Sequence, residues 1–288
     1  MRRRAKTFSF KGFLKLTRFP NLLMIGLTQY MAVIFLAGYP DNWVNMLYDF
    51  QLFLLSSSTI IIAAAGYIIN DYYDVKIDYV NKPERVVVGK LIKRRVVLVS
   101  HSFLNFIGIG IGFYLSTSVG IINFFAAFLL WLYSNRLKHI AFVGNFTISL
   151  LSGLALVVVA FYYKSNVNLI LNYAVFAFSI TLIREIVKDL EDLRGDERFG
   201  SRTLPVILGI HKTKVLLYFL IAFFVFLLFF LALRLHNPIL NNFFILLTMP
   251  ILYFIYLLYR ADTQSRFKNL SDFCKLIMLA GILSMAFF

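Results

Sequence analysis

The chain has 288 residues, of which 60% are hydrophobic, and its formal net charge is +15. A mean hydropathy of +0.78 excludes an ordinary soluble domain. The single cysteine, Cys274, excludes an internal disulfide framework. Together these properties predict an integral membrane protein.

The chain begins with a basic segment, residues 1–18, which we expect to be a retained cytoplasmic lead-in because no small-residue cleavage site follows the first apolar stretch. Apolar stretches of about 20 residues, long enough to cross the hydrocarbon core as helices, come next. In chain order they are 19–38, 51–70, 94–115, 118–135, 140–162, 168–187, 213–234, 239–259 and 270–288. Barrel strands would instead alternate in hydrophobicity over about ten residues. We therefore predict an all-α membrane protein with nine spanning helices.

The basic residues test this count, because Lys and Arg concentrate in cytoplasmic loops. If the N-terminus is inside, the cytoplasmic side holds every Lys and Arg except Lys164 and Arg234, provided that Lys275, at the start of the last stretch, is counted there. This partition predicts a multi-pass inner-membrane protein whose N-terminus and charged loops are cytoplasmic. The charge surrounds membrane ends, which favours anionic lipid headgroups and disfavours nucleic acid as a partner.

Two acidic segments follow the second and sixth apolar stretches. They are NDYYDVKID, residues 70–78, and KDLEDLRGD, residues 188–196. Each places three carboxylates at i, i+3 and i+7: Asp71, Asp74 and Asp78 in the first, and Asp189, Asp192 and Asp196 in the second. At about 100° per residue, a helix would carry each set on one face. Like charges on one face repel and are costly to desolvate near a bilayer, so a cation must compensate them.

Oxygen-rich faces without nearby His or Cys favour a hard cation such as Mg²⁺, which binds carboxylates together with substrate phosphates. Basic residues stand near both segments. Lys82 and Arg85 lie in a stretch that Pro83 and Gly89 mark as a loop. Arg184 precedes the second segment, and Lys188 is its first residue. The alternative is that each acidic segment is a solvated helix end neutralised by these cations. The repeated spacing favours a site that breaks a bond to pyrophosphate.

Four segments resemble the motifs of one family in order. NDYYDVKID matches the pattern NDxxDxxxD, NKPER (residues 81–85) matches NKPxR, YSNRLKHIAFVGN (residues 133–145) is similar to YSxxLK…GN, and KDLEDLRGD matches KDxxDxxGD. With nine apolar stretches, the sequence thereby resembles the UbiA superfamily of intramembrane prenyltransferases over nearly its whole length. The resemblance implies that residues 1–288 form one domain, a bundle of nine transmembrane helices around a central cavity.

By this resemblance, two Mg²⁺ ions would hold a prenyl diphosphate donor at the cytoplasmic mouth of the cavity. One ion would be bound by Asn70, Asp71, Asp74 and Asp78, and the other by Asp189, Asp192 and Asp196. Lys82, Arg85 and Lys188 would contact the diphosphate. Asn145 would lie in the acceptor region, and Tyr67 is a candidate for shielding an allylic cation.

The second motif narrows the choice of acceptor. REIVKDLEDLRGD, residues 184–196, is most similar to members that transfer a geranylgeranyl group to geranylgeranylglyceryl phosphate, and Arg184 would suit a phosphorylated acceptor. An aromatic acceptor, such as 4-hydroxybenzoate or another quinone precursor, is the alternative within the family. A membrane cation transporter is the alternative of a different class, but it would usually carry its carboxylates near the bilayer midplane on broken helices.

Overall fold

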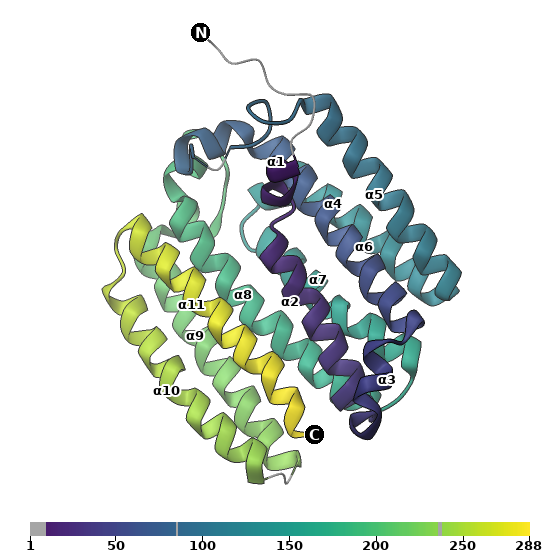
Figure 1. Cartoon of the computed structure of the whole chain (residues 1–288). Helices are drawn as coiled ribbons and strands as arrows, with labels where there is room; N and C mark the ends of the chain where they lie inside the picture. The colour runs from purple at the N-terminus through teal and green to yellow at the C-terminus, as the bar shows by residue number, and fades with distance from the viewer. Residues whose placement is uncertain (1–9, 85, 236–237) are drawn as a thin grey trace.

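The computed structural model describes residues 10–84, 86–235 and 238–288. Apart from two isolated β-bridges, every regular element in these ranges is helical. The helices are α1 (Phe10–Leu16), α2 (Phe19–Met31), α3 (Trp43–Leu47), α4 (Phe50–Asn81), α5 (Arg94–Leu115), α6 (Thr117–Asn135), α7 (Val143–Tyr163), α8 (Val167–Arg198), α9 (Leu204–Leu235), α10 (Pro238–Arg260) and α11 (Gln264–Leu283). The chain crosses repeatedly from end to end of the bundle, and α1 and the C-terminus lie at opposite ends of it (Figure 1).

Within the described ranges, nine helices are long and apolar enough to cross a membrane. The prediction of an all-α, nine-span membrane protein is therefore confirmed, although several boundaries differ. The first span consists of α2 continued by a π-helical turn, Ala32–Leu36. The seventh begins early, at Leu204, because α9 includes a kink at Gly209, where φ is 77° and ψ is 164°. The short helices α1 and α3 are too short to give an apolar-run signal.

The two spans that carry the acidic motifs are longer than their apolar stretches. Helices α4 and α8 have 32 residues each and continue through residues 70–78 and 188–196. At 1.5 Å per residue each is about 48 Å long, whereas the hydrocarbon core is about 30 Å thick. The acidic ends can therefore project beyond the core. Helix α4 ends at Asn81, just before the turn that contains Pro83, and the segment after it is the expected loop.

Two large buried clusters hold most of the bundle together, and a smaller third one joins α1, α4 and α5. One large cluster joins α8 to α9, α10 and α11 and includes Ile186, Leu217 and Leu258. The other large cluster joins the π-helical turn after α2 to α4, α6, α7 and α8 and includes Leu52 and Leu156. Helix α8 contributes to both large clusters and packs against α7, α9 and α11, so it is the central element of the fold.

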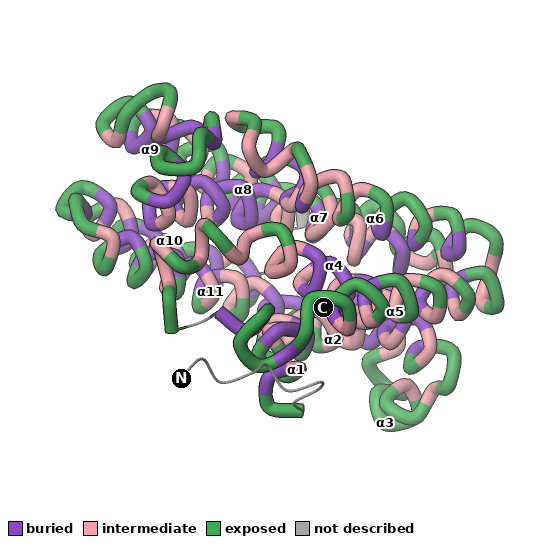
Figure 2. Tube along the Cα trace, turned by 90° about the horizontal axis from the view of Figure 1, so that it is seen from above, coloured by how far each residue is buried: buried purple, intermediate pink, exposed green. Residues whose placement is uncertain are grey.

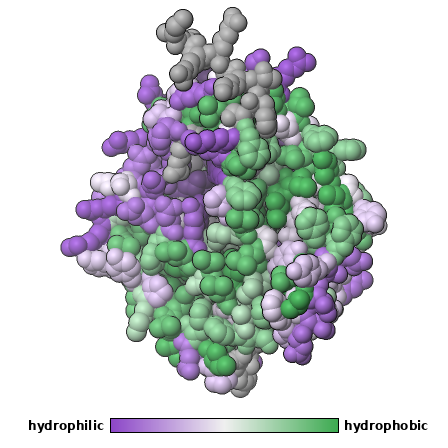
Figure 3. All heavy atoms as spheres, in the orientation of Figure 1, coloured by the Kyte–Doolittle hydropathy of each residue, from purple (hydrophilic) through white to green (hydrophobic). Residues whose placement is uncertain are grey.

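The outward surfaces are rich in large apolar side chains, as expected for contact with lipid. Exposed residues lie along the outer sides of the helices (Figure 2). They include Phe106, Phe219 and Tyr259. A large group of hydrophilic residues lies toward one end of the molecule, around the ends of α8 and α11 near α1, with a largely hydrophobic surface below it and a smaller hydrophilic group at the lower right (Figure 3). This polar end carries the acidic motifs.

Candidate active site

The first acidic motif occupies the last turns of α4. Arg18 Nη2 lies 2.9 Å from Asp71 Oδ1. Asp74 has two partners, because Lys138 Nζ lies 2.6 Å from its Oδ1 and Asn70 Nδ2 donates to its Oδ2 at 2.8 Å. Two of the three carboxylates on this face are thus compensated by basic side chains from distant segments.

The second acidic motif occupies the last turns of α8 and has a different set of partners. Asn145 Nδ2 on α7 donates a 2.8 Å hydrogen bond to Asp189 Oδ2. Thr203 Oγ1 donates to Asp196 Oδ2 at 3.2 Å. Lys82 Nζ lies 2.7 Å from Asp192 Oδ1 and 2.9 Å from Glu191 Oε1. The carboxylates of this motif therefore contact α7, the α8–α9 connection and the loop after α4.

Lys82 and Asn81 link the two aspartate motifs at one end of the bundle. Lys82 follows the first motif in sequence and contacts the second in space. Asn81, the last residue of α4, donates through Nδ2 to the Asp192 carbonyl oxygen at 3.0 Å and accepts a 2.9 Å hydrogen bond from Gly195 N at its Oδ1. The ends of α4 and α8 are thereby joined, with their acidic segments adjacent at one end of the bundle.

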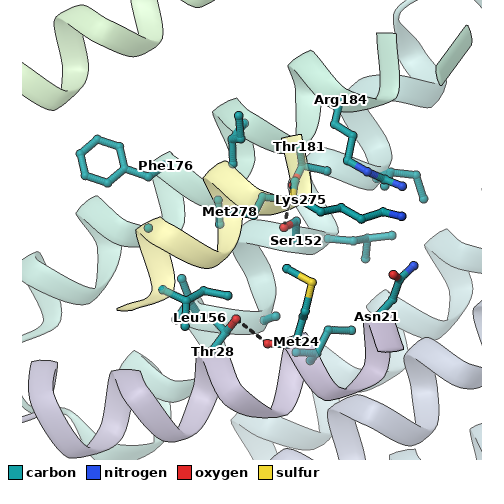
Figure 4. Close-up of a pocket in the computed structure, with 18 of the residues that line it drawn as sticks. Asn21, Met24, Thr28, Ser152, Leu156, Phe176, Thr181, Arg184, Lys275 and Met278 are labelled. Atoms are coloured by element: carbon teal, nitrogen blue, oxygen red, sulfur yellow. Dashed lines mark hydrogen bonds between the residues drawn. The ribbon is translucent and has the colours of Figure 1, made fainter. Parts of the chain in front are cut away.

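A cavity of about 320 Å³ lies below these ends, between α2, α4, α6, α7, α8, α9, α10 and α11. Its walls are mostly apolar, with Leu156 and Phe176 among the lining residues. Charged residues concentrate at one side, where Arg184 and Lys275 extend together with Asn21, and Phe176 lies at the opposite side (Figure 4). The cavity can hold a long apolar chain with a charged group at one end.

Four of the residues predicted from sequence line this cavity: Tyr67, Asn70, Arg184 and Lys188. Tyr67 accepts a 3.3 Å hydrogen bond from Asn21 Nδ2, and the Arg18 guanidinium lies 4.9 Å from the centre of its ring. Lys188 Nζ lies 3.4 Å from Glu185 Oε2, and Arg184 Nη1 lies 2.6 Å from Glu185 Oε1. At the charged side of the cavity, Glu185 therefore forms ion pairs with both Arg184 and Lys188.

The other predicted residues lie outside the cavity lining. They are the six aspartates of the motifs, with Lys82 and Asn145. Arg85 lies outside the described residues. Among the residues that the structure describes, no three His, Cys, Asp or Glu side chains converge as a metal cluster. The donors are nevertheless carboxylate and amide oxygens, which is the chemistry that Mg²⁺ prefers. Three of the six aspartates, Asp71, Asp74 and Asp192, are now paired with basic side chains. The donor set fits Mg²⁺.

The structure adds four residues that we did not predict as part of the site: Arg18, Asn81 and Lys138, which contact the acidic motifs, and Tyr133, which lines the cavity. Lys138 and Tyr133 lie within YSNRLKHIAFVGN, and Asn81 begins NKPER, so the motif matches could have identified these three residues. No sequence pattern identifies Arg18, because its position depends on a left-handed backbone (φ 52°, ψ 52°) at the junction of α1 and α2.

Burial alone would lower the pKa of Arg18, but the Asp71 carboxylate outweighs burial and raises it, so the guanidinium remains charged.

Comparison with known proteins establishes the class. Residues 26–279 match the model of the UbiA prenyltransferase family. The chain therefore belongs to this family, and the protein is a membrane-embedded prenyltransferase.

Among the sequence relatives, digeranylgeranylglyceryl phosphate synthase of Methanosphaera stadtmanae is 33% identical over 205 residues, which is 71% of each chain. The synthase of the same name from Korarchaeum cryptofilum is 31% identical over 262 residues, 88% of this chain and 92% of its own. A solved structure of a membrane digeranylgeranylglyceryl phosphate synthase superimposes with a TM-score of 0.71 at 25% identity, covering 96% of both chains. A UbiA homologue from Archaeoglobus fulgidus bound to GPP and Mg²⁺ shares the fold, with a TM-score of 0.64 at 16% identity over 95% of this chain and 99% of its own.

Proposed function

We propose that this protein transfers a geranylgeranyl group from geranylgeranyl diphosphate to the free hydroxyl of geranylgeranylglyceryl phosphate and releases diphosphate. One observation carries the proposal: Asn81 and Lys82 hold two aspartate motifs together above a cavity that is cationic at one side and apolar elsewhere. The relatives named digeranylgeranylglyceryl phosphate synthase support this choice of acceptor.

The proposed metal sites use the two acidic faces. Asn70, Asp71, Asp74 and Asp78 would hold one Mg²⁺, and Asp189, Asp192 and Asp196 a second. When bound, Mg²⁺ supplies neutralising charge for the diphosphate leaving group. The structure of the Archaeoglobus fulgidus homologue with GPP and Mg²⁺ supports a divalent metal beside a prenyl diphosphate. Lys138 and Lys82, which now contact Asp74 and Asp192, would then become available to diphosphate oxygens.

The residues of this chain also define how the reacting groups are held. Lys82, Lys188 and Arg85 would bind diphosphate oxygens, and the prenyl chain would extend into the apolar part of the cavity. The bond between C1 and the diphosphate oxygen breaks, and its electron pair leaves with diphosphate. The acceptor oxygen bonds to C1, and its proton passes to the departing diphosphate. The Tyr67 ring would stabilise positive charge at C1, and the apolar walls would exclude water.

The proposed orientation places the N-terminus and both aspartate motifs on the cytoplasmic side. The distribution of the basic residues supports it, since among Lys and Arg only Lys164 and Arg234 would lie on the opposite side. The water-soluble ions and diphosphate would then exchange with the cytoplasm.

The experiment is an acceptor panel with the purified protein in lipid nanodiscs. Radiolabelled geranylgeranyl diphosphate and Mg²⁺ would be incubated with geranylgeranylglyceryl phosphate, with 4-hydroxybenzoate, or with no acceptor, and the lipid products identified by mass spectrometry. We expect one new ether product, formed only with the glyceryl phosphate. Transfer to 4-hydroxybenzoate alone would replace this acceptor with the aromatic one. Mg²⁺-dependent ion flux in liposomes without transfer would favour a transporter.

A further inference from the structure

The charged side of the cavity carries more positive than negative charge. Among the described lining residues, the basic ones are Arg18, Arg184, Lys188 and Lys275, and the only carboxylate is Glu185. Arg18 is paired with Asp71 above the cavity. Glu185 is shared between Arg184 and Lys188. An excess of positive charge between low-dielectric walls attracts an anion, and Arg184 and Lys275 are the cations with unused capacity.

The Arg184 guanidinium has a hydrogen-bond donor that is not used within the described structure. Its side chain is only 17% exposed, and Nη1 contacts Glu185 Oε1 at 2.6 Å. Its Nε is buried and has no hydrogen-bond partner among the described residues. A buried donor without a partner is costly, and the guanidinium fork suits two oxygens of a phosphate. This geometry indicates a binding partner that enters from the cavity.

Lys275 supplies a second cation from the neighbouring helix α11. Its pairing with Asp272 Oδ1 is 2.8 Å long, but the Asp272 side chain is 56% exposed and that of Lys275 37%. An exposed pair of this kind contributes little free energy, so the ammonium can change partner at little cost. Arg184 and Lys275 extend toward the same side of the cavity (Figure 4).

Two hydroxyl groups lie beside these cations. Thr181 precedes Arg184 by three residues on α8, donates a 3.0 Å hydrogen bond to Ser152 Oγ on α7, and lines the cavity together with Ser152. Residues three apart share one face of a helix. The wall thus combines two cations with two hydroxyls, a set suited to a phosphate monoester on a glycerol backbone.

We propose that Arg184 and Lys275 form the subsite that binds the phosphate of the lipid acceptor, with Ser152 and Thr181 contacting oxygens of its headgroup. This inference rests on the proposed function, because it assigns the acceptor of that reaction to one wall of the cavity. The donor's diphosphate is the other possible occupant. Arg184 lies one helical turn, about 6 Å of rise, deeper than Lys188 and farther from the acidic motifs that would hold the diphosphate, so the geometry favours the acceptor.

The test measures the KM of each substrate separately. Lys275→Gln is the principal variant, since it removes only an exposed ion pair, and Arg184→Lys keeps the charge of the buried group while losing its fork. Lys268→Gln is the matched control, because Lys268 is exposed on the same helix and does not line the cavity. We expect Lys275→Gln and Arg184→Lys each to raise the KM for geranylgeranylglyceryl phosphate about tenfold, the loss of one charge-assisted contact, with the KM for geranylgeranyl diphosphate nearly unchanged.

A binding measurement separates this inference from the proposed function. Geranylgeranylglyceryl phosphate and its neutral analogue geranylgeranylglycerol would be titrated onto the protein in EDTA, without donor, and followed by native mass spectrometry. We expect the wild type to prefer the phosphate form and Lys275→Gln to lose that preference, whether or not transfer occurs. Absence of transfer by the wild type would count against the proposed function alone. Equal binding of both lipids by the wild type, an unchanged acceptor KM in Lys275→Gln, or an equal rise in donor KM would overturn the subsite.

Discussion

Asn81 at the end of α4 fits directly against Gly195 on α8. Its Oδ1 accepts a 2.9 Å hydrogen bond from Gly195 N, and a β-carbon added at Gly195 would overlap the Asn81 side chain. The two residues are 114 positions apart in sequence. Their contact fixes how closely the two aspartate motifs approach each other.

Gly195→Ala should therefore separate the ends of α4 and α8. Overpacking of a close contact costs about 1–3 kcal/mol of stability, and the displaced motifs should transfer prenyl groups more slowly. Thermal unfolding in nanodiscs and the rate of transfer at saturating substrates would measure the two effects. Gly110→Ala is the control, because Gly110 is exposed on α5 and an added β-carbon meets no atom within 4 Å. Equal behaviour of the two variants would contradict the prediction.

Both aspartate motifs should be required for transfer. Asp74→Ala and Asp192→Ala, made separately, should each lower the rate on the order of 100-fold or more, comparable to the loss of one preorganised charge-stabilising group. The double variant should be little worse than either single one, because groups that act as a unit are not additive. Asp41→Ala, an exposed change on a turn far from both motifs, is the control. Substantial activity in either single variant would mean that one motif suffices.

Lys138→Met should make the protein more dependent on Mg²⁺. Lys138 lies 2.6 Å from Asp74, and both side chains are mostly buried, 9% and 17% exposed. Removing one member of a buried pair leaves the other charge uncompensated, at a cost of about 3–5 kcal/mol. A bound cation would replace part of what is lost, so saturating Mg²⁺ should raise the Tm of this variant more than that of the wild type.

The matched variant is Lys76→Met, since Lys76 is exposed on the same helix as Asp74. Its Tm should respond to Mg²⁺ as the wild type does. If Lys138→Met gains no more from Mg²⁺ than Lys76→Met, Asp74 does not belong to the metal site.

Stability should fall in mildly acidic solution through His139, which lies between α6 and α7. Burial, with Lys138 nearby, lowers the pKa of His139 below its usual 6.5, and Asp74 only partly opposes this. The unfolded chain then binds a proton more readily than the folded one, so stability is present above pH 6.5 and is lost as pH falls toward the folded pKa. Its Nδ1 lies 2.8 Å from Ser201 Oγ.

His139→Gln should keep a polar partner for Ser201 and remove the titration. The difference in Tm between wild type and His139→Gln should therefore shift in favour of the variant between pH 7 and pH 5.5. A difference that does not vary with pH would show that His139 does not contribute.

The membrane helices could be predicted because crossing the bilayer requires a long apolar run of consecutive residues. Their ends could not, since helix formation does not require apolar side chains. The apolar stretches end at residues 70 and 187, but the helices continue to Asn81 and Arg198. Few helix-breaking residues interrupt these extensions. The acidic faces could likewise be predicted, because a regular spacing on one helix is a local property.

The partners of those faces depend on which distant segments meet. Arg18 is 53 residues from Asp71, and Lys138 is 64 residues from Asp74. Lys275 could be counted as a cytoplasmic charge, but its place in the cavity wall follows from the packing of α11 on α8. Such contacts are set by tertiary structure, and composition and spacing carry no direct signal for them.

The length of α4 and α8 affects how substrates and products reach and leave the site. Because each helix exceeds the thickness of the hydrocarbon core by about 18 Å, the acidic ends can stand in water while the cavity below them remains at the depth of the lipid chains. Ions and diphosphate can then enter and leave from the aqueous side, and apolar chains from the bilayer. Neither kind of molecule has to cross the phase in which it is insoluble.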